Sequence, residues 1–404
     1  MRILFVEKQI DYEPLGLLYL SSVLRQAGHE VRLAIAADEN PVTVARAWQP
    51  DVVGYSVYTG SQTYYRDLNL RIKEAATGAV SIFGGPHPTY FPEFVEQPGV
   101  DAVCIGEGEG AILDLVEAVE AGRPLTGIDN WWFKRDGSVE RNPVRALKND
   151  LDVLPFPDRE LLFEKDAFTR QSGIKHFITS RGCPYDCTYC FNHALAEIYR
   201  GKGKRLRQAS VSKVIEEVRW VQQRYPMQFV VFLDDLFIVY ADWLRELAEQ
   251  FPRNVGLPFF CNVRANLVTP EKIELLKRAG CVSVGMGLET GNPALRNKVL
   301  NRNLSDEQII EASRLIRQAG IELLTTNMVG LPGGALEHDF ETLALNHACR
   351  PAYANAFLYQ PYPRTELGEY AREQGYVEGS LDDIDPSAWE RTVLRFSSPA
   401  EKRQ

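Results

Sequence analysis

The chain has 404 residues, of which 45% are hydrophobic and 25% are charged, and its formal net charge is −9. This length exceeds one typical domain and suits two, each able to bury its own core. No window approaches the about 18 uncharged apolar residues of a membrane span, so we expect none. The acidic balance disfavours binding to a phosphate backbone, which Lys and Arg side chains normally drive, and we expect no nucleic-acid partner.

The cysteines and the position of the first predicted strand indicate the cellular compartment of the protein. Seven cysteines form an odd set with three of them inside residues 183–190, which is typical of a metal site in a reducing compartment rather than a disulfide framework. The first predicted strand begins at Arg2, which leaves no room for a signal peptide. We therefore expect a cytoplasmic protein.

The first half alternates short apolar runs with segments of helical length. Its predicted strands are 3–6, 31–34, 52–57, 80–83 and 102–105, and its predicted helices are 15–27, 41–48, 62–76 and 111–121. This alternation predicts crossovers between parallel strands, and so a Rossmann-like open parallel sheet. A hairpin is predicted over 131–141, which completes a first domain at 1–147. Residues 148–170, with the sequence LDVLPFP at 151–157, are interpreted as a stiff linker.

The alternation restarts in the second half. Strands are predicted at 176–179, 229–233, 259–263, 282–286, 322–328 and 355–359. The segments between them are amphipathic, for example 211–225 and 305–318, and the latter is followed by Gly320, a typical helix-ending residue. Six βα units predict a partial (β/α)6 TIM-type barrel over 171–365, with a short C-terminal segment at 366–404. The predicted fold class is therefore α/β, an open sheet followed by a partial barrel.

Three cysteines follow the first predicted barrel strand in a C-x-x-x-C-x-x-C loop. Cys183, Cys187 and Cys190 can converge on one side of one loop. Iron–sulfur clusters take cysteine thiolates, and three ligands for four irons leave one iron open to a non-protein ligand. The alternative is a structural zinc site that His193 completes as Cys₃His.

Other chemistry-bearing residues stand at the ends of later barrel strands. Asp234 and Asp235 end the second strand, Arg264 the third, and Glu289 lies in the glycine-rich segment that closes the fourth. Taken alone, the Asp pair could be a helix cap or surface turn, and Arg264 could form an ordinary salt bridge. Strand C-terminal ends are, however, where barrel active sites lie.

Tyr189 directly precedes the third cysteine, so the loop reads C-x-x-x-C-x-aromatic-C. This resembles the signature of radical S-adenosylmethionine (SAM) enzymes, and the resemblance covers about residues 145–365. It implies a four-iron four-sulfur cluster on Cys183, Cys187 and Cys190. The open iron would chelate SAM, whose reductive cleavage gives a 5′-deoxyadenosyl radical. The sixth strand exit has Arg364 where glycine is more usual. The positions that the resemblance assigns to SAM are Tyr189, Asp234 or Asp235, Arg264, Glu289, Asn327 and Gly330.

A Rossmann-like domain ahead of such a barrel resembles the cobalamin-dependent subgroup of these enzymes. The resemblance assigns cobalamin to Leu15, Gly16, Ser56, Thr59, Gly84, Gly85, His87, Thr89, Gly106, Glu107, Gly108 and Glu109. Glycines suit strand C-terminal ends where a bulky ligand approaches the backbone. The motif D-x-H-x-x-G is absent, so no histidine ligand below the cobalt is expected, and His87 is expected to be hydrogen-bonded rather than metal-bound. The alternative is a docking domain without cobalamin.

Together these resemblances imply a cobalamin-dependent radical SAM methyltransferase. One SAM would methylate cobalamin, and a second would yield the radical that opens an unactivated carbon of a small molecule or peptide for methylation. A reductant such as flavodoxin or ferredoxin would supply electrons. One alternative keeps both cofactors but performs a non-methylating oxidative rearrangement or cyclisation. The other is a non-catalytic corrinoid or zinc-binding protein. A methylthiotransferase is disfavoured because Cys104 is the only cysteine before residue 183.

Overall fold

A computed structural model describes residues 1–135, 137–380, 383–384, 389 and 391–396. The chain forms two compact units. The first comprises Met1–Ser172 with Ile198–Lys204, and the second comprises Gly173–Glu197 with Arg205–Gln404. Within the described residues, no helix is both long and apolar enough to cross a membrane.

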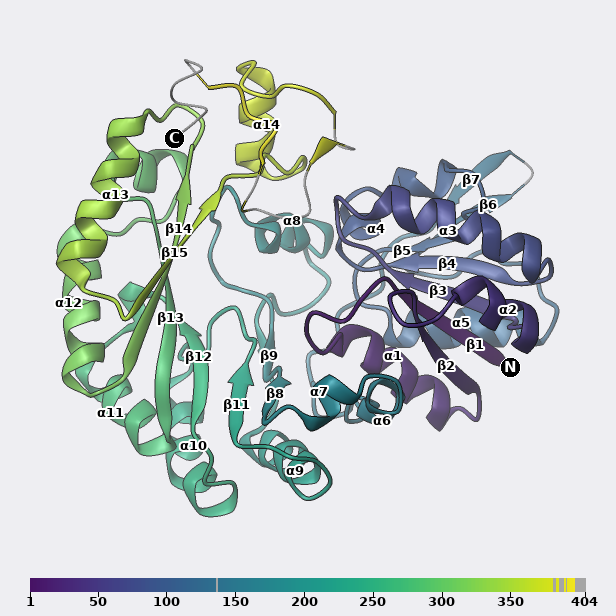
Figure 1. Cartoon of the computed structure of the whole chain (residues 1–404), viewed down its shortest axis with the longest axis horizontal. Helices are drawn as coiled ribbons and strands as arrows, with labels where there is room; N and C mark the ends of the chain where they lie inside the picture. The colour runs from purple at the N-terminus through teal and green to yellow at the C-terminus, as the bar shows by residue number, and fades with distance from the viewer. Residues whose placement is uncertain (136, 381–382, 385–388, 390, 397–404) are drawn as a thin grey trace. The chain divides into compact units, whose positions relative to one another are not determined.

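The first unit is built on a seven-stranded sheet with the order β2-β1-β3-β4-β5-β6-β7 (Figure 1). The first five strands run parallel, and β6 and β7 form the antiparallel hairpin that the sequence predicted. The strands are β1 (Arg2–Glu7), β2 (Glu30–Ile35), β3 (Val52–Ser56), β4 (Val80–Gly84), β5 (Ala102–Cys104), β6 (Trp131–Arg135) and β7 (Ser138–Arg141).

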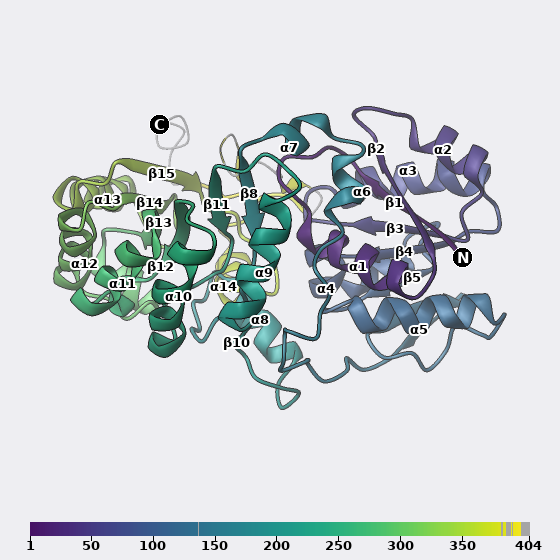
Figure 2. The same cartoon turned by 90° about the horizontal axis from the view of Figure 1, so that it is seen from below.

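Helices cover both faces of this sheet, α1 and α5 on one and α2 and α3 on the other (Figure 2). They are α1 (Leu15–Gln26), α2 (Pro41–Trp48), α3 (Gln62–Ala75), α4 (Pro86–Tyr90), η1 (Pro92–Glu96) and α5 (Glu109–Glu120). Consecutive residues of the central strands, such as Val52 and Val53, are fully buried because both faces of the sheet are covered. Burial of these apolar side chains drives the packing. The Rossmann-like fold is confirmed, although α4 and η1 were not predicted.

The segment predicted as a linker packs on α1 and belongs to the first unit. The hydroxyl of Ser21 donates to Asp158 at 2.6 Å, and that of Ser22 donates to the carbonyl of Phe156 at 2.6 Å. Arg159 and Glu13 form an ion pair, and both side chains are wholly buried. Two short helices, α6 (Arg159–Phe163) and α7 (Ala167–Gln171), continue the segment. The domain boundary itself stays a prediction.

The second unit is a curved parallel sheet with the order β15-β14-β13-β12-β11-β8. Its strands are β8 (Ile174–Phe177), β11 (Phe229–Phe232), β12 (Phe259–Val263), β13 (Cys281–Glu289), β14 (Glu322–Val329) and β15 (Tyr353–Leu358). A small antiparallel pair, β9 (Ser180–Arg181) with β10 (Arg207–Gln208), stands beside it. Six parallel strands that do not close confirm the predicted partial barrel.

The helices of the second unit lie along the outer side of this sheet, each packed against the next (Figure 1). They are α9 (Val211–Gln222), α10 (Ala241–Asn254), α11 (Pro270–Ala279), α12 (Asp306–Gln318) and α13 (Leu336–Cys349), with α8 (Phe191–Ile198) and α14 (Glu366–Glu373) apart from this row. Helix α12 begins with a capping box made by Ser305 and Gln308. It ends before Gly320, whose φ of 77° suits glycine.

Candidate active site

The cysteine loop leaves the sheet at the carboxyl end of β8 and begins with a glycine. Any other residue at this position would force the neighbouring backbone to shift. Gly182 has a φ of 91°, and a Cβ there would collide with the carbonyl oxygen of Arg205. Further along, the Thr188 hydroxyl donates to the carbonyl of Val299 at 2.6 Å. Arg205 also forms an ion pair with Asp186 at 2.6 Å. These contacts hold the loop at both ends and in the middle.

The three thiols of the loop are close enough to influence one another's charge. Cys187 is buried, whereas Cys183 and Cys190 are partly exposed. Burial raises the pKa of the Cys183 thiol, and raises that of Cys190 to about 11. Metal binding must therefore displace protons from these thiols.

The donor set of the loop suits an iron–sulfur cluster. It consists of three cysteine thiols, and cysteine thiolates are the ligands that such clusters take. His193, the expected fourth zinc ligand, instead directs Nδ1 at the Asp186 carboxylate, 3.0 Å away. The arrangement fits an iron–sulfur cluster.

Asp234 anchors the strand that leads into the cysteine loop. Its fully buried carboxylate accepts the N–H of Thr179 at 3.1 Å, the hydroxyl of Thr179 at 2.8 Å and the hydroxyl of Ser180. Burial raises its pKa to about 6, against the effect of these hydrogen bonds. Asp234 therefore joins the carboxyl ends of β8 and β11, and its oxygens are occupied by protein donors.

Asp235 has the opposite surroundings. Its side chain is exposed, and the negative charge of its carboxylate helps to raise the pKa of the Cys183 and Cys190 thiols. Crowding by protein atoms raises the pKa of Asp235 itself, opposed by a hydrogen bond from Asn192. The same Asn192 amide lies 3.8 Å from the Cys190 sulfur. Asn192 thus connects Asp235 with the last cysteine of the loop.

Glu289 is held inside the barrel by two side chains. Its Oε1 accepts the Tyr189 hydroxyl at 3.2 Å and Nη1 of Arg302 at 3.3 Å. Arg302 also donates to the Tyr189 oxygen, and to the carbonyl of Gly287 at 2.6 Å. A Cβ at Gly287 would overlap the Glu289 carboxylate. Burial raises the pKa of Glu289, and the positive charge of Arg302 opposes this.

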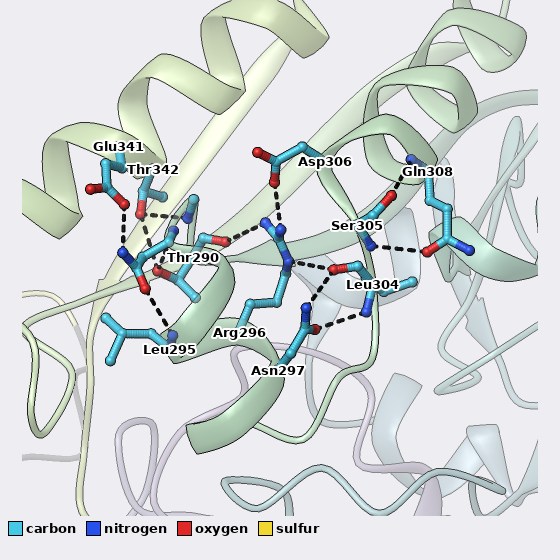
Figure 3. A network of polar contacts seen from close by, with 12 residues as sticks. Thr290, Leu295, Arg296, Asn297, Leu304, Ser305, Asp306, Gln308, Glu341 and Thr342 are labelled. Atoms are coloured by element: carbon cyan, nitrogen blue, oxygen red, sulfur yellow. Dashed lines mark hydrogen bonds and ion pairs between the residues drawn. The ribbon is translucent and has the colours of Figure 1, made fainter.

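A polar network holds the segment from Thr290 onward, which directly follows β13 (Figure 3). The fully buried guanidinium of Arg296 donates to the carbonyl of Thr290 at 3.2 Å and to that of Leu304 at 2.9 Å, and it pairs with Asp306. Arg296 lies in η3 (Leu295–Val299), a single π-helical turn. Such turns are frequent at functional sites. Glu289 itself has a φ of 71°, a conformation that this support stabilises.

Arg264, at the end of β12, is fully engaged with protein groups. Nη1 lies 3.4 Å from the Cys187 sulfur, Nε donates to the Asn266 side chain at 3.1 Å, and Nη2 donates to the carbonyl of Arg302. The guanidinium carbon lies 3.9 Å from the centroid of the Tyr185 ring. The side chain is buried beside a cysteine of the loop.

Asn327 and Gly330, the two positions predicted on β14, differ in their setting. The Asn327 side chain is buried between β14 and α13, where it donates to the carbonyl of Asn355 at 2.9 Å and accepts from Asn346 at 2.7 Å. Both ends of its amide are therefore engaged, the nitrogen with β15 and the oxygen with α13. Gly330 follows the strand with a φ of 71°, and its N–H points at the Asp339 carboxylate 3.3 Å away.

In the first unit, the turn after β4 packs on the turn after β3. Gly85 has a φ of 92°, and a Cβ there would lie 2.9 Å from the N atom of Val57. His87 is buried, with Nδ1 3.1 Å from the Thr59 hydroxyl and its N–H donated to the carbonyl of Val57 at 2.8 Å. His87 is therefore hydrogen-bonded, as expected.

The turn after β5 is occupied by a residue that follows the cysteine loop in the chain. Tyr199, in the excursion 198–204 that belongs to the first unit, fills the space beside Gly106 and accepts the N–H of Glu107 at 2.8 Å. Gly106 also donates its N–H to the Thr89 hydroxyl at 3.0 Å. The glycine at 106 thus accommodates a tyrosine of the same chain, where the sequence had suggested an approaching corrin.

The start of α1 is the most open part of the predicted cobalamin site. No atom lies within 4 Å of a Cβ built on the exposed Gly16, so a ligand can reach its backbone. The remaining predicted positions lie at the carboxyl edge of the same sheet, where open α/β sheets bind ligands. Among them, Leu15 and Glu109 are buried, and Gly108 is the N-cap of α5. Of these positions, Gly16 is exposed, and Ser56, Gly84 and Gly85 are partly exposed at the ends of β3 and β4.

Comparison with known proteins identifies both units. The B12 binding domain family matches residues 1–116, and the Radical SAM superfamily matches residues 177–345. An uncharacterized methyltransferase of Pyrococcus horikoshii is 29% identical over 368 residues, 89% of this chain and 78% of that protein. The anaerobic magnesium-protoporphyrin IX monomethyl ester cyclase of Rubrivivax gelatinosus is 27% identical over 398 residues, 91% of this chain and 69% of that protein.

The fold is also that of a solved enzyme. The radical SAM methyltransferase TsrM of Kitasatospora setae, with cobalamin and a [4Fe-4S] cluster bound, superposes with a TM-score of 0.77 over 99% of this chain and 84% of that one, at 20% identity. The two units thus define a B12 binding domain followed by a radical SAM domain. The chain therefore has the domain composition of a cobalamin-dependent radical SAM enzyme, and the solved enzyme with this fold has cobalamin and a [4Fe-4S] cluster bound.

The sequence analysis missed three residues of this site. For Arg302 the sequence offers one weak indication, the two asparagines that flank it. Asn301 and Asn303 adopt φ values of 53° and 52°, a turn conformation that asparagine adopts readily. Asn192 lies two residues past the last loop cysteine but belongs to no motif. Tyr199 lies 92 residues from its partner Glu107, and no local pattern links the two.

Proposed function

We propose that this chain transfers a methyl group from SAM to an unactivated carbon of a small molecule or peptide. The observation that carries the proposal is the loop of Cys183, Cys187 and Cys190 at the carboxyl end of β8, in a chain that also has a B12 binding domain. The relatives named as methyltransferases support it.

Each cofactor would be held by a distinct set of residues. Cys183, Cys187 and Cys190 would bind three irons of the cluster and leave the fourth to the amino and carboxylate groups of SAM. When bound, the cofactors supply the electron transfer, the radical and the methyl carrier, while the protein positions them and excludes water.

For SAM, we propose Asp235 rather than Asp234 as the partner of the amino group. The oxygens of Asp234 are taken by Thr179 and Ser180, whereas Asp235 is exposed beside the thiols. A carboxylate suits a cationic amino group through a charge-assisted hydrogen bond. Glu289, held by Tyr189 and Arg302, would contact SAM from β13.

For cobalamin, we propose contacts along Gly16, Ser56, Gly84 and Gly85, with no histidine below the cobalt. The only histidine among the predicted cobalamin positions, His87, is buried and faces the Thr59 hydroxyl. These residues would seat the corrinoid, which supplies the methyl carrier when bound.

The test needs no knowledge of the substrate. The chain is reconstituted anaerobically with iron, sulfide and hydroxocobalamin, then incubated with SAM and a strong reductant. We expect about four irons and about four sulfides per chain, formation of 5′-deoxyadenosine, and S-adenosylhomocysteine in an amount that matches the bound cobalamin. Cys190→Ala should lose the 5′-deoxyadenosine, whereas Cys349→Ala, a buried cysteine on α13, should retain it. Zinc in place of iron would refute the proposal.

A second candidate keeps both cofactors but transfers no methyl group. The similarity to an enzyme named as a cyclase supports it. A rearrangement or cyclisation would give 5′-deoxyadenosine without S-adenosylhomocysteine. The ratio of these two products therefore decides between the candidates.

The chemistry of the cluster and the charge of the chain also indicate the electron donor, the compartment and the substrate class. A low-potential electron donor such as flavodoxin or ferredoxin would reduce the cluster, and a reducing cytoplasm would keep the three thiols available. The formal net charge of −9 speaks against a nucleic-acid substrate.

A further inference from the structure

The guanidinium of Arg264 contacts a cysteine of the loop directly. Its Nη1 lies 3.4 Å from the Cys187 sulfur, within hydrogen-bonding range for a sulfur acceptor. Both side chains are buried. A positive charge in a buried setting acts more strongly on its neighbours than it would in water.

The guanidinium is held in this position from every side. It stacks on the Tyr185 ring at 3.9 Å, its Nε donates to Asn266, and Nη2 donates to the carbonyl of Arg302. Asn266 in turn donates to the Tyr185 hydroxyl at 2.9 Å. The side chain is therefore preorganised toward the sulfur before any cofactor arrives.

We propose that Arg264 sets the reduction potential of the cluster through its hydrogen bond and charge at Cys187. This inference rests on the proposed function, because it requires the three cysteines to hold a cluster. Reduction adds one electron to the cluster, and a nearby cation and an N–H···S bond both favour the more negative, reduced form. Cluster potentials depend on net charge and on hydrogen bonds to the sulfurs. Arg264 therefore raises the potential and eases electron entry.

The surroundings of the other two cysteines carry the opposite charge. Asp235 is an exposed carboxylate that directly follows Asp234, whose own oxygens bind Thr179 and Ser180 just ahead of the cysteine loop. Its carboxylate disfavours added negative charge on the cluster and so lowers the potential. Arg264 and Asp235 thus act on the same property from two sides of the loop, with opposite sign.

The alternative role for Arg264 is to bind the SAM carboxylate with its forked donors. The two roles predict different measurements, because a carboxylate clamp changes SAM affinity but leaves the potential of the SAM-free cluster unaltered. A conservative substitution sharpens the contrast. Lysine retains the charge but lacks the planar fork that Tyr185 and Asn266 hold in place.

The experiment is a redox titration of the reconstituted full chain without SAM, followed by electron paramagnetic resonance. Iron and sulfide are quantified first in the unmutated protein. Arg264→Gln should shift the midpoint potential to more negative values, Arg264→Lys should shift it less, and Asp235→Asn should shift it to more positive values. Arg314→Gln on the exposed side of α12 makes the same charge change far from the loop and should leave the potential unaltered.

Each outcome has a definite meaning. An Arg264→Gln protein with a full cluster, an unchanged potential and weakened SAM binding would overturn the inference in favour of the clamp. If that variant fails to retain iron, Tyr185→Leu and Asn266→Ala loosen the guanidinium without removing it. Unchanged potentials in both would also overturn the inference. Absence of a cluster in the unmutated protein would instead refute the proposed function.

Discussion

The phenol oxygen of Tyr199 lies in the space that a side chain at Gly106 would occupy, and it accepts the N–H of Glu107 at 2.8 Å. Asn130 adds a further contact at 3.4 Å. Burial raises the pKa of Tyr199 to about 12. A tyrosine that follows the cysteine loop in the chain thus stabilises a turn of the B12 binding domain.

Alanine at position 106 should destabilise this turn. The φ of 77° costs a side chain about 1–2 kcal/mol, and overpacking against Tyr199 adds about 1–3 kcal/mol. Gly127→Ala is the matched control, because Gly127 has a φ of 65° but nothing within 4 Å of its Cβ position. Urea unfolding of the full chain, with hydrogen exchange over residues 102–120, compares the two. Equal losses would show that Tyr199 does not constrain the turn.

Substitution of Asp234 should reduce mainly the stability of the fold, whereas substitution of Asp235 should reduce mainly the affinity for SAM. Asp234→Ala leaves the N–H and hydroxyl of Thr179 and the hydroxyl of Ser180 without their acceptor, which should cost at least about 3 kcal/mol. Asp235→Asn should change stability by less than about 0.5 kcal/mol and weaken SAM binding about tenfold or more. Thermal unfolding and anaerobic calorimetric titration measure the two effects. Asp242→Asn on the exposed start of α10 controls for charge. A weakened SAM affinity in that control, or none in Asp235→Asn, would contradict the assignment.

Glu7 should make the stability of the first unit depend on pH. Burial raises its pKa to about 7 from an ordinary 4.5, against the hydrogen bond from Tyr65. The folded state therefore holds this proton more tightly than the unfolded state, so its contribution is full below about pH 4.5 and is lost as the pH rises through about 7. The loss amounts to at most about 3 kcal/mol.

Glu7→Gln removes this dependence while retaining an acceptor for Tyr65. Because Asp234 has a raised pKa too, the informative quantity is the difference in unfolding free energy between the variant and the unmutated protein. The variant should become relatively more stable between pH 4.5 and pH 8, by at most about 3 kcal/mol. Urea unfolding at several pH values measures it, with Glu246→Gln on α10 as control. Parallel curves for Glu7→Gln would refute the effect.

Arg302 and Glu289 should be strongly coupled. Arg302→Met leaves a buried carboxylate without its cation and should cost about 3–5 kcal/mol. Tyr189→Phe removes one hydroxyl and should cost about 1 kcal/mol. The double variant Glu289→Gln with Arg302→Met should lose less than Arg302→Met alone. A double-mutant cycle by urea unfolding measures the coupling, and additive losses would show that the pair acts independently.

Much of the fold followed from local patterns. The helix predicted at 305–318 is α12, with its capping box and with Gly320 after its end, because both signals lie within the helix and its flanks. The strand predicted at 259–263 is β12 to the residue. The cysteine loop was found for the same reason, since its spacing lies within eight residues of sequence.

Local sequence patterns establish the order of these units: which runs form strands, where the cysteine loop and its neighbouring motifs stand, and that each motif ends a strand. Only the folded chain shows which side chains within a motif remain exposed and which are engaged by other parts of the protein. Burial and long-range partners separate Asp234 from Asp235, turn Asn327 toward α13, direct Arg264 at Cys187 and bring Tyr199 to Gly106. These outcomes depend on contacts between residues far apart in the chain, which no local pattern encodes.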